Sequence, residues 1–253
     1  MIDRELTVDD TPTIRVSIRS GRVNVEGGKP GLVRFKVDTT DPTFEIRPAA
    51  DAIVASGDRG GRVFVTVSVP PMTDMEIGTV SGDVDIEPRL GRLDVTTVSG
   101  EVEFETVERL QARTTSGGIR GKRVNGEAIC VTTSGDIKVS EVVDGGDFST
   151  RSGSVVIVNC AGTVSCATLS GNIRIEELSG PTARIKSMSG GVRLGLPPRT
   201  RLELDAHTLA GRGTWPTANP SRDRGRENSR MSTVPPGLST RKYSRKVTPR
   251  SVT

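Results

Sequence analysis

The side chains that most often carry catalysis or bind metals are scarce in this chain of 253 residues. Its three cysteines, Cys130, Cys160 and Cys166, form no CxxC pair. Its single histidine is His207, so a histidine-dependent triad would have to use that residue. A four-ligand zinc site needs more cysteines or histidines than the chain has. We therefore predict no catalytic, metal-binding or cofactor-binding residues, and we interpret two of the three cysteines as small core side chains.

Acidic residues follow several Ser-Gly steps, as in the SGD and SGE sequences that contain Asp83, Glu101 and Asp136. Carboxylates of this kind could bind calcium. However, the Gly-Gly-x-Gly-x-Asp pattern of calcium-binding β-helix repeats is absent from the chain. We therefore interpret the Ser-Gly step as a structural feature and not as part of a ligand site.

The Ser-Gly step recurs at spacings of 17 to 19 residues and reveals an internal repeat. Thr or Ser stands two residues before each serine, and mostly apolar residues stand four before, three after and five after it. This alternation predicts two short, half-buried strands per repeat. We expect each glycine to provide a positive φ at a tight bend. The predicted structural turns are Ser81, Gly82, Ser99, Gly100, Ser116, Gly117, Ser134, Gly135, Ser152, Gly153, Ser170, Gly171, Ser189 and Gly190.

Two architectures fit this pattern: an antiparallel meander of hairpins, or a solenoid in which each repeat forms one coil stacked on the previous one. A meander of such short strands would need a second layer or a wide barrel that the chain cannot fill. We therefore predict an all-β fold, a single-chain β-solenoid of about seven 18-residue coils. The aligned threonines could form a hydrogen-bonded ladder inside the rod.

Composition divides the chain into three regions. Residues 1–74 contain strand patterns separated by Gly and Pro, and we expect them to cap the first coil. Residues 75–211 carry the repeats and end with a predicted strand at 201–207. Residues 212–253 are rich in Ser, Thr, Pro and Arg without apolar periodicity, and predict a disordered basic tail. Such a tail could contact anionic lipid or nucleic acid, or have no partner.

The repeats also carry a family resemblance. The units are TVSGDVDI at 79–86, TVSGEVEF at 97–104, TTSGDIKV at 132–139 and TLSGNIRI at 168–175, after a Val69-Pro70 step. With these motifs the chain resembles the DUF4097 family of adhesin-like proteins over about residues 10–211. The resemblance implies a β-solenoid or β-roll with no established catalytic residues. The chain departs from the family pattern after Gly211, where another strand pair would be expected.

Outward-facing charges suggest how such a rod could act. The predicted interaction residues are acidic in the first repeats and basic in the last: Asp83, Asp85, Glu101, Glu103, Arg174, Arg184, Lys186 and Arg193. One hypothesis is a non-enzymatic interaction module that binds a protein or glycan along its ladder faces. The alternative is a structural protein that stacks head to tail, as bactofilins do. Screened surface charge without a partner would explain the same pattern.

An enzymatic role and a membrane location find less support. A polysaccharide-active enzyme built on a solenoid needs long insertions that wall a cleft, and these repeats have none. No stretch of 18 apolar residues is present, and no apolar run follows a basic start at the N-terminus. We therefore predict no membrane span, no secretory signal and a cytoplasmic location.

Overall fold

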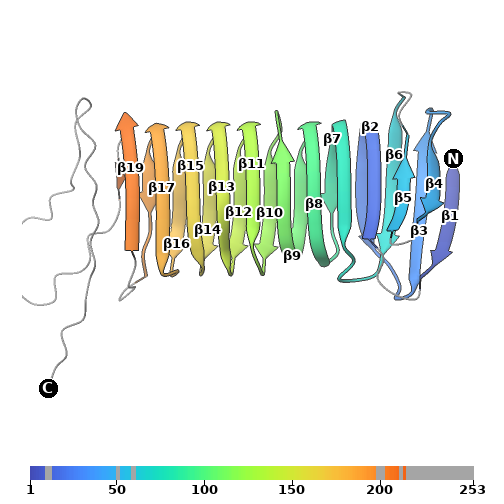
Figure 1. Ribbon diagram of the computed structural model, residues 1–253, viewed down its shortest axis with the longest axis horizontal. Helices are drawn as coiled ribbons and strands as arrows, with labels where there is room; N and C mark the ends of the chain where they lie inside the picture. The colour runs from blue at the N-terminus through green and yellow to red at the C-terminus, as the bar shows by residue number, and fades with distance from the viewer. Residues whose placement is uncertain (9–12, 50–51, 58–60, 198–202, 211–212, 215–253) are drawn as a thin grey trace, which may run out of the picture.

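The computed structural model describes residues 1–8, 13–49, 52–57, 61–197, 203–210 and 213–214. Within these residues all regular structure is β-strand, and the strands stack along one long axis (Figure 1). The predicted β-solenoid is confirmed. Each coil of the repeat region contributes one strand to each of two facing sheets, because the chain alternates inward and outward side chains on both sides of the Ser-Gly step.

We call the two faces sheet 1 and sheet 2, and both are parallel throughout the repeat region. Sheet 1 holds the strands that precede the Ser-Gly steps: the first half of β7 (Met75–Ile86), β8 (Leu90–Ser99), the second half of β9 (Val102–Thr114), β11 (Ala128–Ser134), β13 (Gly145–Ser152), β15 (Thr163–Ser170) and β17 (Thr182–Ser189). Sheet 2 holds the strands that follow: the other halves of β7 and β9, then β10 (Ile119–Val124), β12 (Ile137–Val142), β14 (Val155–Cys160), β16 (Ile173–Leu178) and β18 (Val192–Leu194).

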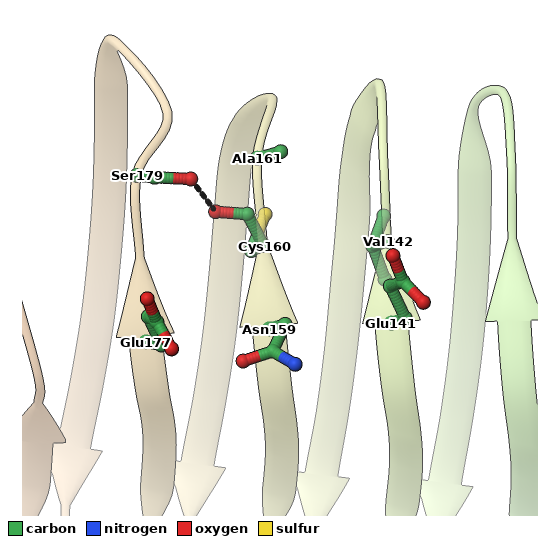
Figure 2. Close-up of a pocket in the computed structure, with 7 residues that line it drawn as sticks. All are labelled: Glu141, Val142, Asn159, Cys160, Ala161, Glu177 and Ser179. Atoms are coloured by element: carbon green, nitrogen blue, oxygen red, sulfur yellow. Dashed lines mark hydrogen bonds between the residues drawn. The ribbon is translucent and has the colours of Figure 1, made fainter. Parts of the chain in front are cut away.

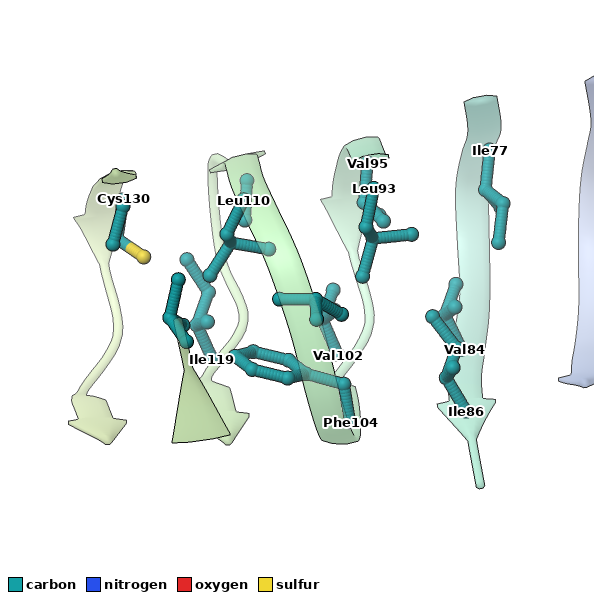
Figure 3. Close-up of a cluster of buried hydrophobic side chains, with 14 of the residues drawn as sticks. Ile77, Val84, Ile86, Leu93, Val95, Val102, Phe104, Leu110, Ile119 and Cys130 are labelled. Atoms are coloured by element: carbon teal, nitrogen blue, oxygen red, sulfur yellow. The ribbon is translucent and has the colours of Figure 1, made fainter. Parts of the chain in front are cut away.

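Equivalent residues of successive repeats lie opposite one another. Ser134 pairs with Ser152, and Ser152 with Ser170, so the corners form a column along the rod. The inward Val, Ile and Leu side chains of both sheets meet between them and form one continuous core (Figure 3). Because the repeats share this core, each coil depends on its neighbours for burial.

The buried threonines do not form a ladder with one another. Instead, the Thr150 hydroxyl donates to the carbonyl oxygen of Gly135 at 3.2 Å, one coil earlier. Thr132 and Thr168 make the equivalent bonds, each to the Ser-Gly glycine of the preceding coil. In these coils the threonine therefore ties its corner to the preceding one, whereas the buried hydroxyls of Thr79, Thr97 and Thr114 have no hydrogen-bond partner among the described residues.

The Ser-Gly glycines lie at the corners, but our expected reason for them was wrong. Of the seven, only Gly190 has a positive φ, at 146°. The requirement is space: a Cβ on Gly135 would lie 2.0 Å from the carbonyl oxygen of Gly117 in the coil before. Gly153 has the same relation to Gly135. Only glycine lets the corners approach this closely.

One further coil lies in the N-terminal region. The first half of β2 (Thr13–Gly27) pairs with the sheet 1 part of β7 and its second half with the sheet 2 part, which places Ser20 opposite Ser81. Ser20 and Gly21 therefore form another corner. The sequence repeat did not reveal it because Ile18 replaces the threonine and because a long insertion separates this coil from the next.

The inserted residues continue the rod away from β7. β5 (Ala52–Ser56) and β6 (Val63–Val69) pair in parallel with the two halves of β2. The last strands at this end are antiparallel: β4 (Glu45–Pro48) on β5, β3 (Leu32–Thr39) on β6, and β1 (Ile2–Thr7) on β3. The stack thus extends into residues 1–74, whose role as a separate cap stays a prediction.

At the other end, β19 (Glu203–Ala210) pairs with β17 and β20 (Gly213–Thr214) pairs with β18. The strand that we predicted at 201–207 therefore reaches Ala210, which lies opposite Ser189. Apart from Gly213 and Thr214, the predicted basic tail at 212–253 lies outside the described residues.

Candidate interaction surface

The exterior of sheet 2 is crossed by ion pairs between neighbouring coils. Arg120 lies 3.1 Å from Glu103, and Arg123 lies 2.6 Å from Glu141. Further pairs between coils on this face are Arg22 with Asp83, Lys122 with Glu105 and Arg120 with Glu101, and Arg174 pairs with Glu176 within β16. Each exposed pair contributes little to stability, but together they leave few charges on this face for a partner.

The acidic residue after a Ser-Gly step has a structural task. Asp83 Oδ1 accepts a hydrogen bond from the backbone N–H of Glu101 at 3.0 Å, and Asp136 Oδ1 accepts one from Ser154 at 2.9 Å. Asn172 does the same for Gly191. These side chains complete the hydrogen bonding of the backbone where the chain leaves the corner. The SGD sequence is therefore explained without a ligand.

The four predicted acidic interaction residues all lie on sheet 2. Asp85 lies opposite Glu103, Asp83 lies beside Asp85 in β7, and Glu101 directly precedes β9. They do not form the end of the rod, because the β2 coil with Arg22 lies beyond β7. They are thus partly neutralised and placed along one side.

The four predicted basic interaction residues are divided between the two sheets. Arg174 and Arg193 are neighbours on sheet 2. On sheet 1, Arg184 lies opposite Asp205 and Lys186 lies opposite His207. The structure therefore does not bring the basic residues together on one surface.

The exterior of sheet 1 differs from that of sheet 2. Along β11, β13, β15 and β17, all within the described residues, no ion pair is present. At the C-terminal end of the column just before the serine, three exposed apolar side chains follow one another: Leu169 is 42% exposed, Met188 49% and Leu209 66%. They belong to β15, β17 and β19, whose register makes them direct neighbours. We call these three residues the apolar ridge.

Sequence reasoning missed the apolar ridge although its signal was present. The column before the serine reads Val80, Val98, Thr115, Thr133, Arg151, Leu169, Met188 and Leu209. The apolar residues at its C-terminal end are adjacent only once the coils are stacked. Contiguous exposed apolar side chains often mark a site of interaction.

A hollow of about 240 Å³ lies where sheet 2 turns back (Figure 2). Glu141, Asn159 and Glu177 line it from adjacent strands, and the Ser179 hydroxyl donates to the carbonyl of Cys160 at 3.4 Å. Glu141 is already paired with Arg123. In the described part of the chain, no three His, Cys, Asp or Glu side chains group as metal ligands.

The three cysteines lie in the core, and the histidine lies on the exterior. All three cysteines are buried and unpaired. Burial raises the pKa of Cys130 to about 12 and raises the pKa of Cys166 as well. His207 Nε2 lies 2.7 Å from Asp205 Oδ1 on the exterior of β19. The thiols are thus protected from ionisation, as expected of core side chains.

A family model described as Toastrack DUF4097 matches residues 56–235. The chain belongs to this family. Compared with the resemblance over about 10–211, the match begins after the β2 coil and runs beyond Gly211. The comparison with curated proteins gave no match.

Solved structures from three bacteria share the fold of this DUF4097 protein. A "putative adhesin" from Parabacteroides merdae is 16% identical, with a TM-score of 0.55, and the match covers 84% of this chain and 94% of that one. A "putative lipid binding protein" from Parabacteroides distasonis is 15% identical, with a TM-score of 0.55, and the match covers 84% of this chain and 94% of that one. A "putative adhesin" from Bacteroides fragilis is 15% identical, with a TM-score of 0.50, and the match covers 78% of this chain and 96% of that one. At these identities the likeness shows the fold alone.

No helix among the described residues is long and apolar enough to cross a membrane.

Proposed function

We propose that this DUF4097 protein is a non-enzymatic interaction module that binds a protein partner through the exterior of sheet 1. The observation that carries the proposal is the contrast between the two faces. Ion pairs occupy the charges of sheet 2, whereas sheet 1 presents the apolar ridge of Leu169, Met188 and Leu209. The centre of a protein interface is typically depleted of charged residues and enriched in methionine.

The chemistry of sheet 1 favours a protein over a glycan. From β11 to β17 its exterior carries mainly aliphatic, small and hydroxyl side chains, and no aromatic ring on which a sugar could stack. Arg184 and Lys186 lie beside the ridge in β17 and supply a basic rim. A flat apolar strip with a polar rim is the usual arrangement of a protein interface.

The relatives support a binding role of this kind. Two of the three solved structures carry adhesin names and the third a lipid-binding name; none of the three names is that of an enzyme. The head-to-tail filament has no specific observation in its favour, since the acidic residues do not lie at the end of the rod.

The test compares two matched double variants of the full chain in affinity capture from the source organism. L169D/M188D places carboxylates on the ridge, whereas V156D/V158D places them on β14 of sheet 2 at half-buried positions. We expect the first to capture at least tenfold less partner and the second to capture as much as the wild type. Equal capture by both variants, or equal loss from both, would refute sheet 1 as the binding face. Thermal unfolding of both variants checks that the fold is intact.

A further inference from the structure

The strands at the two ends of the rod differ in length, proline content and charge. At the N-terminal end, β4 has four residues, includes Pro48 and carries a pair between Arg47 and Glu45 at 3.1 Å. β1 carries Asp3 and Glu5, both paired with Arg34. Short strands, proline and charge protect an edge from pairing with another chain. β19 at the C-terminal end is eight residues long and contains no proline, lysine or arginine.

The edge of β19 that faces away from β17 carries backbone groups that pair with no strand among the described residues. The Glu203 N–H donates to the carbonyl of Pro181 at 2.9 Å, toward β17. Since backbone groups of successive residues in a strand point to opposite sides, Leu204 and Ala206 direct theirs away from β17. Within the described residues, β19 pairs with no strand other than β17.

The inward side chains of β19 lack full cover. Leu204 and Ala206 are only partly buried, whereas Ala183 and Ile185, opposite them in β17, are fully buried. A strand added at this edge would therefore cover apolar surface as well as satisfy backbone groups. The edge has both features that β-augmentation requires.

We propose that β19 pairs antiparallel with β19 of a second copy of this chain, about a two-fold axis at Ala206. This register places Ala206 opposite itself in a hydrogen-bonded pair and Leu204 opposite Thr208 of the second copy. Inward residues then meet inward residues, which a shift by one residue would prevent. The cores of the two rods become continuous.

Side-chain pairing favours this register over its neighbours, because the Asp205–His207 pair within each strand then lies antiparallel to the same pair of the second copy. With Ala206 on the axis, each Asp205 lies opposite His207 of the second copy, in a non-hydrogen-bonded pair whose side chains are close. A shift by two residues in one direction would place Asp205 opposite Asp205, although His207 would then face Glu203, and a shift in the other direction would place His207 opposite His207. Arg184 and Lys186 of β17 lie beside the same surface, and their positive charge stabilises the Asp205 carboxylates there.

Disulfide trapping in the full chain tests the pairing. Cα atoms of a hydrogen-bonded antiparallel pair are about 5.5 Å apart, within the range of a disulfide. A206C should therefore form a disulfide-linked dimer under mild oxidation. L209C is the matched control: Leu209 is more exposed, but its two copies would lie about 20 Å apart at 3.4 Å per residue. Rapid cross-linking of L209C, or none of A206C, would overturn the proposal.

A charge swap supplies a second measurement that does not depend on cysteine chemistry. In sedimentation of the full chain, H207D should weaken dimerisation at least tenfold because carboxylates then face carboxylates. The double variant D205H/H207D again places a histidine opposite each aspartate and should recover the dimer. A wild-type chain that stays monomeric at all concentrations, as it would if residues 215–253 covered this edge, contradicts the proposal. A ridge-dependent partner could still bind such a monomer, so the two proposals fail separately.

Discussion

The ring of Phe104 occupies the space that a side chain at Gly121 would need. A Cβ on Gly121 would lie 2.0 Å from Phe104 Cζ, and the two residues lie opposite each other in β9 and β10 of sheet 2. The same column holds Ile86, Val139 and Ile157 in other coils. A large residue in one coil is thus matched by a missing side chain in the next, so core volume is conserved between coils.

We predict that G121V alone destabilises the protein by about 1–3 kcal/mol, because the added side chain collides with the ring. F104V/G121V should recover most of the loss, since both positions then carry a β-branched aliphatic side chain, as Ile86, Val139 and Ile157 do in the same column. Urea unfolding monitored by circular dichroism measures both free energies. A double variant as unstable as G121V would show that the two residues are not coupled.

The corner glycines provide the second prediction. We expect G135A to destabilise the fold by at least about 1–3 kcal/mol, since the methyl group would approach the carbonyl oxygen of Gly117. G27A is the control because a Cβ there meets no atom within 4 Å. The midpoints of thermal unfolding compare the two variants, and a similar small shift in both would argue against close approach at the corners.

The acidic residue of the SGD step provides the third prediction. D136A should cost about 1 kcal/mol because the N–H of Ser154 loses its acceptor. D136N should cost much less, since Asn172 makes the equivalent bond to Gly191. Denaturant titration separates the two, and a loss with D136N equal to that with D136A would mean that charge and not hydrogen bonding matters at this position.

The buried thiols provide the fourth prediction. With its pKa raised to about 12 by burial, Cys130 should not react with Ellman's reagent at pH 8 until the protein unfolds, and neither should Cys166. The reaction is best followed in a C160A background. Because the folded-state pKa lies above the unfolded value, the stability that these thiols contribute is complete below about pH 9 and lost as the pH rises above it. Rapid labelling of the native protein would contradict this burial.

The repeat in the sequence was sufficient to predict the fold of residues 75–194. The spacing of the serines and the alternation around them determine the coils, their parallel stacking and the buried column that contains Thr150. The β2 coil could not be predicted in the same way, because Ile18 interrupts the threonine column and the insertion hides the spacing. The pairing of Phe104 with Gly121 depends on register between coils, which no single repeat contains.

The surface was harder to predict than the fold. Glu103, one of the outward charges that suggested an interaction site, pairs in the structure with Arg120 of the neighbouring coil, whereas the role of the other predicted residues stays a prediction. The apolar ridge becomes visible only when Leu169, Met188 and Leu209 are stacked. The cytoplasmic location and the role of the basic tail stay predictions.

Site-specific photo-cross-linking in the source organism tests the binding face most directly, because it captures any protein in contact with the chosen position, whatever its identity. A photoreactive amino acid at position 188 reports on the ridge of sheet 1, and one at position 156 reports on sheet 2. The account predicts a discrete cross-linked protein from position 188 and none from position 156. The same adduct from both positions, or an adduct from position 156 alone, would contradict it.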